Sequence, residues 1–298
     1  MNITITGATG FIGRRLVERL CRERHSLHIL SRAATQSSSG HARTFVWDPW
    51  KGPPPEESLS GADAVIHLAG EPVSQRWTPE AKHRIRESRV RGTRSLVEAM
   101  SRSGKRPSVL VSASAIGYYG SRGDEILTEM SAPGQGFLPQ VCAEWEQEAV
   151  AAEAFGVRVV RLRTGIALGR GGGALAKMLP PFKLGVGGQI GSGRRWMSWI
   201  HLDDLVGLIL HAVQSPIHGA LNCTAPNPVT NAEFTRALAG NLKRPAIFPV
   251  PPLALKILFG EMAEIVLASL RVTPRAAQDS GYRFRYTELP SALGDILA

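Results

Sequence analysis

Cysteine is scarce in this sequence and long apolar runs are missing. Its three cysteines, Cys21, Cys142 and Cys223, are odd in number and far apart, which argues against a disulfide framework and against a zinc cluster. We therefore expect buried free thiols and no metal site. No run of about eighteen apolar residues occurs, so no membrane span is expected. The chain starts with strand-like residues and without the pattern of a signal peptide, which favours the cytoplasm.

Acidic residues are too few to balance the basic ones, and the formal net charge is +10. Such a charge raises the possibility of nucleic-acid binding. The arginines are scattered, however, and their densest group has no interleaved aromatic residues on which bases could stack. That group consists of Arg84, Arg86, Arg89, Arg91 and Arg94. We expect a solvated helix face and no nucleic-acid partner, the alternative being a small ligand that carries phosphate.

The chain opens with a short strand that runs into three glycines. Ile3 and Ile5 alternate with polar residues, and the glycines then open a helix with apolar residues four positions apart. A helix start offers unpaired N–H groups and the positive end of the peptide dipoles, so it attracts a diphosphate. The spacing G-x-x-G-x-x-G differs from the usual G-x-G-x-x-G, but the strand and helix around it fit a dinucleotide site. The predicted contacts are Gly7, Thr9, Gly10, Phe11, Ile12 and Gly13.

A second strand, residues 27–30, ends in Ser31 and Arg32. Arg32 stands about twenty residues beyond the glycine turn, where an NAD site has an acidic residue that binds the adenosine ribose. A guanidinium there suits the 2′-phosphate of NADP by its charge and its fork of donors. The sequence therefore favours NADP over NAD, unless Arg32 is an ordinary exposed arginine.

The first half of the chain alternates strands and helices, which predicts a Rossmann-type α/β fold with a doubly wound parallel sheet. Further strands are expected at 44–47, 64–68, 108–112, 157–162 and 220–223, and helices at 79–100 and 201–213. Small residues after the 64–68 strand would let a ligand lie close over its end. Together with the strand after it, this end gives the predicted cofactor contacts Leu68, Ala69, Gly70 and Ser112.

Residues 165–199 are rich in glycine and show no regular period, which indicates the crossing into a smaller lobe. Thr230 and Glu233 form a predicted capping box, so a helix begins there. A final apolar helical region is expected to end near Pro274. We assign residues 1–168 and 199–228 to a cofactor-binding domain. Residues 169–198 and 229–298 form the smaller C-terminal substrate lobe.

Several motifs along the whole chain resemble those of the extended short-chain dehydrogenases/reductases, and within them the epimerase-family proteins of unknown substrate. They include Thr6-Gly-Ala-Thr-Gly-Phe-Ile-Gly13, His67-Leu-Ala-Gly70, Ser88-Arg89, Gly92-Thr93, Trp145-Glu146, Gly169-Arg-Gly-Gly-Gly173 and Trp199-Ile-His-Leu-Asp-Asp204. The resemblance implies a sheet of about seven parallel strands that binds NAD(P) at the carboxyl ends of its strands. It also implies a monomer or a homodimer, the latter formed through helices near 80–100 and 138–155.

The same resemblance implies a catalytic Ser/Thr, Tyr and Lys, with the last two spaced as Y-x-x-x-K on one helix. Ser114 fits the serine. The positions of the other two are held by Leu138 and Cys142, and residues 120–176 contain neither tyrosine nor lysine. The usual proton relay is therefore absent, and any reaction needs another acid or base.

Tyr118 and Tyr119 are the catalytic candidates beside Ser114, although both could merely pack at the sheet edge. Glu125 and Glu129 could reach the same place, or could be surface acids. The candidates for holding the substrate are Glu71, Arg194, Arg195 and His201, the last also fitting a buried structural histidine. The sequence thus predicts an NADP(H)-binding epimerase- or oxidoreductase-like protein acting on a small anionic substrate. The alternative is a non-catalytic NADP(H)-binding regulatory or scaffold protein.

Overall fold

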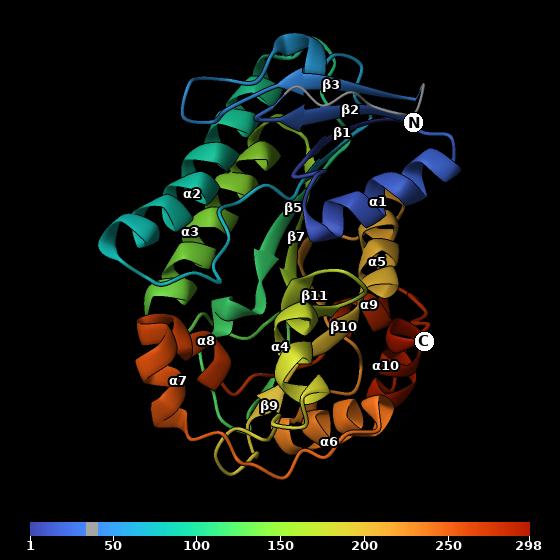
Figure 1. The fold of residues 1–298 in the computed structure, drawn as a ribbon. Coiled ribbons are helices and arrows are strands. Elements are labelled where there is room, and N and C mark those ends of the chain that lie inside the picture. The colour runs from blue at the N-terminus through green and yellow to red at the C-terminus, as the bar shows by residue number, and fades with distance from the viewer. Residues whose placement is uncertain (34–40) are drawn as a thin grey trace.

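A seven-stranded parallel sheet forms the centre of the protein in a computed structural model that describes residues 1–33 and 41–298 (Figure 1). Its strands are β1 (Asn2–Thr6), β2 (Ser26–Ser31), β3 (Ala42–Val46), β4 (Ala64–His67), β5 (Val109–Ala115), β7 (Arg158–Thr164) and β11 (Gly219–Cys223). They lie in the order β11-β7-β5-β4-β1-β2-β3, so the winding reverses between β1 and β4. The predicted doubly wound fold is confirmed.

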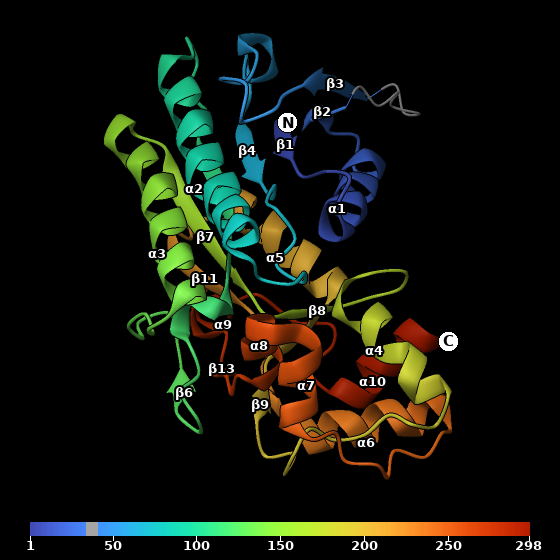
Figure 2. The ribbon, with the colours of Figure 1, turned by 60° about the vertical axis from the view of Figure 1, so that its left-hand side comes forward.

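Helices cover both faces of the sheet. On one face lie α1 (Phe11–Arg22) and α5 (Leu202–Gln214), and on the other α2 (Pro79–Arg102) and α3 (Phe137–Val150) (Figure 2). Side chains alternate between the two faces as the strand period requires. Ile5 and Val111 belong to the core that contains Leu16 of α1, whereas Leu110 belongs to the core that contains Leu96 of α2. Both faces of the sheet are therefore buried.

The rest of the chain gathers beyond the carboxyl ends of the long strands, in the lower part of Figure 1. Its helices are α4 (Gly173–Lys183), α6 (Asn231–Leu242), α7 (Pro252–Phe259), α8 (Ala263–Leu267), α9 (Arg275–Asp279) and α10 (Leu289–Leu297). Its short strands are β6 (Ile126–Leu127), β8 (Ile166–Leu168), β9 (Trp196–Met197), β10 (Trp199–His201), β12 (Val229–Thr230) and β13 (Arg271–Val272). A separate core joins α4, α6 and α10 through Leu175, Phe234 and Leu293. The exact domain boundaries stay a prediction.

Two stretches of this part differ from the sequence-based expectation. Residues 165–199 were expected to be irregular, yet they include α4, whose pattern is hidden by glycines before it and by Pro180 and Pro181 inside it. Helix α10 follows Pro274, beyond the expected end of the helical region. The capping box of Thr230 and Glu233 is confirmed at the start of α6. In the described residues, no helix combines the length and apolarity that crossing a membrane requires.

Candidate functional site

Two glycines at the turn between β1 and α1 leave no room for a Cβ. Gly7 has φ +73°, and a Cβ there would lie 2.7 Å from the carbonyl carbon of Leu68. A Cβ on Gly13 would lie 2.1 Å from the oxygen of Gly7. Gly10 is the N-cap of α1 and provides no side-chain cap, so the first N–H groups of the helix are available to an anion. Phe11 lies against Gly172 and Gly173 at the start of α4, which brings the second lobe to this turn.

The end of β2 lies next to this turn, because Thr6 of β1 is paired with Leu30 of β2. Ser31 is partly buried and Arg32 is exposed. No described carboxylate forms an ion pair with Arg32, so its guanidinium is available to a phosphate. The structure therefore brings together the two parts of the predicted cofactor site.

The end of β4 is tied to β1 by a buried histidine. His67 is hydrogen-bonded through Nδ1 to the hydroxyl of Thr6 (2.7 Å) and through Nε2 to that of Thr93 (3.0 Å). The Thr6 hydroxyl also accepts the N–H of Ala69 (3.1 Å). Burial lowers the pKa of His67 to about 4, so the ring is neutral at pH 7. These bonds set the position of Leu68, Ala69 and Gly70, while Ser112 is buried in the neighbouring strand β5.

Ser114 belongs to a buried charged network. Its hydroxyl donates to Glu146 Oε1 (2.7 Å), and the same carboxylate receives two bonds from Arg163, from Nε (2.8 Å) and Nη2 (2.9 Å). Arg161 donates a further bond to Oε2 (3.1 Å). Burial alone lowers the pKa of Arg163, but its bonds to Glu146 and the charge of that carboxylate outweigh burial and raise the pKa above its usual value. The serine hydroxyl is thus already engaged.

The two neighbouring tyrosines lie in different surroundings. Tyr119 is fully buried; its hydroxyl donates to Asn222 Oδ1 (2.6 Å) and accepts from Arg163 Nη1 (3.0 Å). Burial raises the pKa of Tyr119 to about 12. Tyr118 is partly buried, the Arg163 guanidinium lies 3.5 Å from its ring centroid, and no described residue is bonded to its hydroxyl. Of the three predicted catalytic residues, Tyr118 is the one with an unengaged polar atom.

The two glutamates that could supply the missing acid or base lie in different surroundings. Glu125 is exposed and paired with Arg122 (2.9 Å). The Oε1 atom of Glu129 accepts the N–H groups of Asn222 (3.0 Å) and Ala276 (3.1 Å), and burial raises the pKa of Glu129. In this arrangement Glu129 connects three segments of backbone.

The four residues predicted to hold the substrate come from three segments of the chain. Glu71 follows β4, and its carboxylate accepts from Gln75 (3.2 Å). Arg194 is exposed and Arg195 partly buried, both just before β9. His201 is 4% exposed, accepts the Asp203 N–H (3.1 Å) as the N-cap of α5 and stacks on a tyrosine. Burial lowers the pKa of His201, so its ring is neutral at pH 7.

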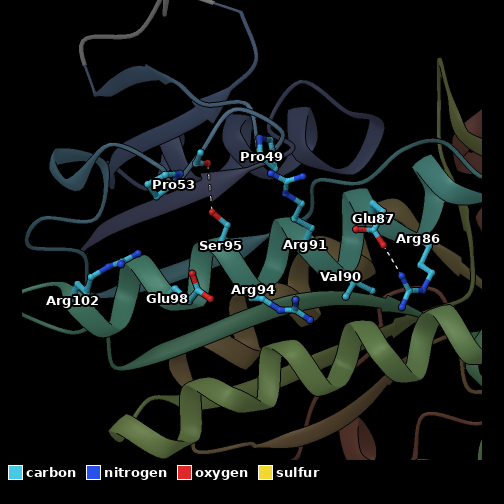
Figure 3. Close-up of a pocket in the computed structure, with 11 residues that line it drawn as sticks. Pro49, Pro53, Arg86, Glu87, Val90, Arg91, Arg94, Ser95, Glu98 and Arg102 are labelled. Atoms are coloured by element: carbon cyan, nitrogen blue, oxygen red, sulfur yellow. Dashed lines mark hydrogen bonds and ion pairs between the residues drawn. The ribbon is translucent and has the colours of Figure 1, made fainter.

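Hollows border the described elements in at least two places. One of about 240 Å³ lies beside the glycine turn and is lined by Phe11, Arg14, Arg15, Glu18, Arg170, Gly171 and Leu202. The other, of about 600 Å³, lies between α2 and the loop after β3 (Figure 3). Its α2 side is formed by Arg86, Glu87, Val90, Arg91, Arg94, Ser95, Glu98 and Arg102. Figure 3 shows Arg86 pairing with Glu87 there, so part of this charge is already neutralised.

Arg163 and Glu146 are site residues that the sequence does not predict. The signal was available, because a charged residue inside an apolar strand such as β7 requires a partner. Arg89 of α2 belongs to a motif of the family resemblance and to the basic group, but the sequence does not distinguish it from its neighbours. Its inward position could not be read from a helix with so many arginines.

Family models and known proteins match this chain along its length. A model described as the NAD dependent epimerase/dehydratase family matches residues 3–223, and a domain of unknown function (DUF1731) matches residues 250–296. The chain is 43% identical to the epimerase family protein SDR39U1 homolog, chloroplastic, of Arabidopsis thaliana, covering 100% of this chain and 87% of that protein. It is 39% identical to the epimerase family protein YfhF of Bacillus subtilis, covering 100% and 98% of the two chains.

Solved structures give the same result. The crystal structure of the human epimerase family protein SDR39U1 (isoform 2) with NADPH has a TM-score of 0.88 and 32% identity, covering 100% of this chain and 99% of that one. MoeE5 in complex with UDP-glucuronic acid and NAD has a TM-score of 0.80 at 21% identity, which supports the fold alone. From the family model and the relatives that match its whole length, the chain belongs to the NAD-dependent epimerase/dehydratase family.

Proposed function

We propose that this protein binds NADP(H) and reduces or oxidises a small anionic substrate, with Tyr118 transferring the proton. The observation that carries the catalytic part is the unengaged hydroxyl of Tyr118, next to Ser114 and Tyr119 whose hydroxyls are bonded. NADPH, when bound, would supply a hydride to a carbonyl carbon. The Tyr118 hydroxyl would donate its proton to the carbonyl oxygen and regain one from water; the reverse reaction oxidises the alcohol.

The preference for NADP rests on Arg32 at the end of β2. The human relative that shares 32% identity was solved with NADPH, which supports this preference. We expect Arg32→Ala to weaken NADPH binding about tenfold, the size of one lost charge-assisted contact, and to leave NADH binding unchanged. Fluorescence titrations with both cofactors measure this. Equal affinity of the unaltered protein for NADH and NADPH would remove the role of Arg32.

A reaction is detected with NADPH deuterated at the 4-pro-R or the 4-pro-S position, incubated with the protein and a metabolite extract. We expect one of the two labels to move into a product, and the transfer to be lost in Tyr118→Phe. The matched control is Tyr282→Phe, which changes a tyrosine outside this site.

The second candidate function is a non-catalytic NADP(H)-binding regulatory or scaffold protein. It is favoured by the engagement of Ser114 and Tyr119 in a bonded network, which leaves a single free catalytic candidate. If neither label moves while NADPH binds, this second function replaces the first.

A further inference from the structure

Arg89 places a guanidinium at the carboxyl end of β4. Its Nη1 donates to the carbonyl of Glu71 (3.0 Å), just after β4, and to that of Ile85 (2.9 Å), one turn back in α2. The guanidinium carbon lies 5.1 Å from the ring centroid of Trp145 in α3. A Cβ on Gly70 would lie 3.2 Å from the same carbon. The group is therefore held between two helices and the end of a strand.

This guanidinium forms no ion pair with the described residues. No carboxylate of the described residues lies within ion-pair distance of Arg89, whereas Arg86 and Arg94 of the same helix reach Glu144 and Glu148 of α3. The carboxylate of Glu71 accepts from Gln75 and lies 3.9 Å from Nε of Arg84. Burial lowers the pKa of Arg89, which reflects the cost of holding this charge away from water, and the negative charge of Glu71 offsets only part of this effect. A buried charge that is compensated only in part is costly unless a further anion completes it.

The bonds that Arg89 makes leave one edge of the guanidinium unused. Both involve Nη1, so Nε and Nη2, whose N–H bonds point in the same direction, make no bond to the described residues. Neither atom is completely shielded from solvent, although the side chain as a whole is partly buried. An edge of this form offers two parallel N–H donors, the arrangement that binds the two oxygens of a carboxylate.

We propose that the Nε–Nη2 edge of Arg89 binds a carboxylate group of the substrate. The inference rests on the proposed function, which places a small anionic substrate at this edge of the sheet. The cofactor is the other source of anionic oxygens. Its expected diphosphate site begins at α1, on one face of the sheet, whereas Arg89 comes from α2 on the opposite face (Figure 2). Gly70, which lies against this guanidinium, is also a predicted cofactor contact, so the titration of NADPH below distinguishes the two sources.

The test uses malonate as the probe and the full chain loaded with NADPH. Malonate is titrated at constant ionic strength, and binding is followed by the rise in Tm and by the fluorescence of bound NADPH. We expect Arg89→Gln to weaken malonate binding at least tenfold while the affinity for NADPH stays unchanged. Arg89→Lys should be intermediate, because an ammonium supplies charge without the fork. The matched control is Arg91→Gln, an exposed arginine of the same helix.

Three results would overturn the inference. Malonate could bind Arg89→Gln as tightly as it binds the unaltered protein, or could fail to bind the unaltered protein at millimolar concentration. Arg89→Gln could also lose affinity for NADPH with malonate binding intact, which would assign the guanidinium to the cofactor. A titration with NADPH alone distinguishes failure of the proposed function from failure of this inference. If the protein does not bind NADPH, the proposed function is wrong whatever the result with malonate. If Arg89→Gln does not fold, Arg89→Lys is titrated in its place, and unchanged malonate affinity in that variant would contradict the inference.

Discussion

Arg163 and Arg89 show two ways of holding a guanidinium inside the same protein. All three nitrogens of Arg163 donate to described residues: Glu146 receives two bonds, and Tyr119 and the Glu129 carbonyl receive the others. Arg89 uses one nitrogen, and only for backbone carbonyls. A saturated buried cation positions the chain around it, whereas an unsaturated one can take up a ligand. The number of bonds that each guanidinium makes therefore distinguishes a structural arginine from one that can bind a ligand. The residue type, which is the same for both, does not.

The positive charge of this site comes from arginines on other elements, because helix α3 lacks the usual lysine. The family resemblance would place that lysine at Cys142 of α3. Burial raises the pKa of the Cys142 thiol to about 12, so it remains uncharged. The positive charges near it come from other elements, Arg163 from β7 and Arg89 from α2. Helix α3 contributes the carboxylate of Glu146 instead.

The largest expected effect comes from removing the saturated cation. Arg163→Met leaves the buried carboxylate of Glu146 without its main partner, and we expect a loss of about 3–5 kcal/mol in the free energy of unfolding. Arg89→Met removes a buried charge without an ion pair, which is stabilising, and two hydrogen bonds to carbonyls, which is destabilising. Because these two effects oppose each other, the free energy of unfolding should change by no more than about 1 kcal/mol. Urea unfolding measures both. Equal losses would break the distinction between the two arginines.

A double variant sharpens the same comparison. Replacing Arg163 and Glu146 together removes both charges, so Arg163→Met/Glu146→Met should lose less stability than the sum of the two single variants. Additive losses would mean that the pair acts as two independent groups.

The next effect concerns the two tyrosines that contact Arg163. Tyr119→Phe leaves Asn222 Oδ1 and Arg163 Nη1 each without one buried partner, and should cost about 1–3 kcal/mol in unfolding free energy. Tyr118→Phe removes a hydroxyl with no protein partner and should change stability by less than about 0.5 kcal/mol. The proposed function adds that Tyr118→Phe loses deuterium transfer. A stability loss in Tyr118→Phe as large as that in Tyr119→Phe would contradict the assignment of a free hydroxyl.

Much of the fold could be predicted because the strands of a parallel sheet are buried on both faces and read as apolar runs. The segments around Ile66 and Val111 show this directly. The glycine turn could be predicted because its backbone excludes side chains at Gly7 and Gly13. Helix α4 could not, since Pro180 and Pro181 inside it are signals that end helices.

The site was harder to predict because its contacts join distant segments. Glu146 and Arg163 meet across a helix and a strand, and Tyr119 reaches Asn222 from a segment far along the chain. Ser114 was identified by position, but its engagement with Glu146 depends on packing. Which arginine of α2 faces inward is likewise decided by packing, since Arg89 lies among neighbours of the same type.

The smallest expected effect concerns the pKa of His67, which reports whether the charge of Arg89 acts on a neighbouring group. The pKa of His67 is about 4 in the folded protein, through burial and then through the charge of Arg89, against about 6.5 in an unfolded chain. Between these values the unfolded chain binds a proton that the folded protein does not. The unfolding free energy therefore falls as the pH is lowered through this window, by up to about 1.4 kcal/mol per pH unit from this group.

In Arg89→Gln the pKa of folded His67 should rise, because one of the causes that lower it is removed. The pH range between the folded and unfolded pKa values of His67 then becomes narrower. The unfolding free energy lost between pH 7 and pH 4.5 should therefore be smaller than in the unaltered protein, and we expect the difference to be under about 1 kcal/mol. Urea unfolding at the two pH values, at matched ionic strength, gives this difference. Groups that do not interact with Arg89 titrate alike in both proteins and cancel. His67→Asn, which lacks the ring, should abolish the part of the contrast that comes from His67. Identical acid dependence in the two proteins would show that the charge of Arg89 is already compensated, and the contrast with Arg163 would then lose its electrostatic basis.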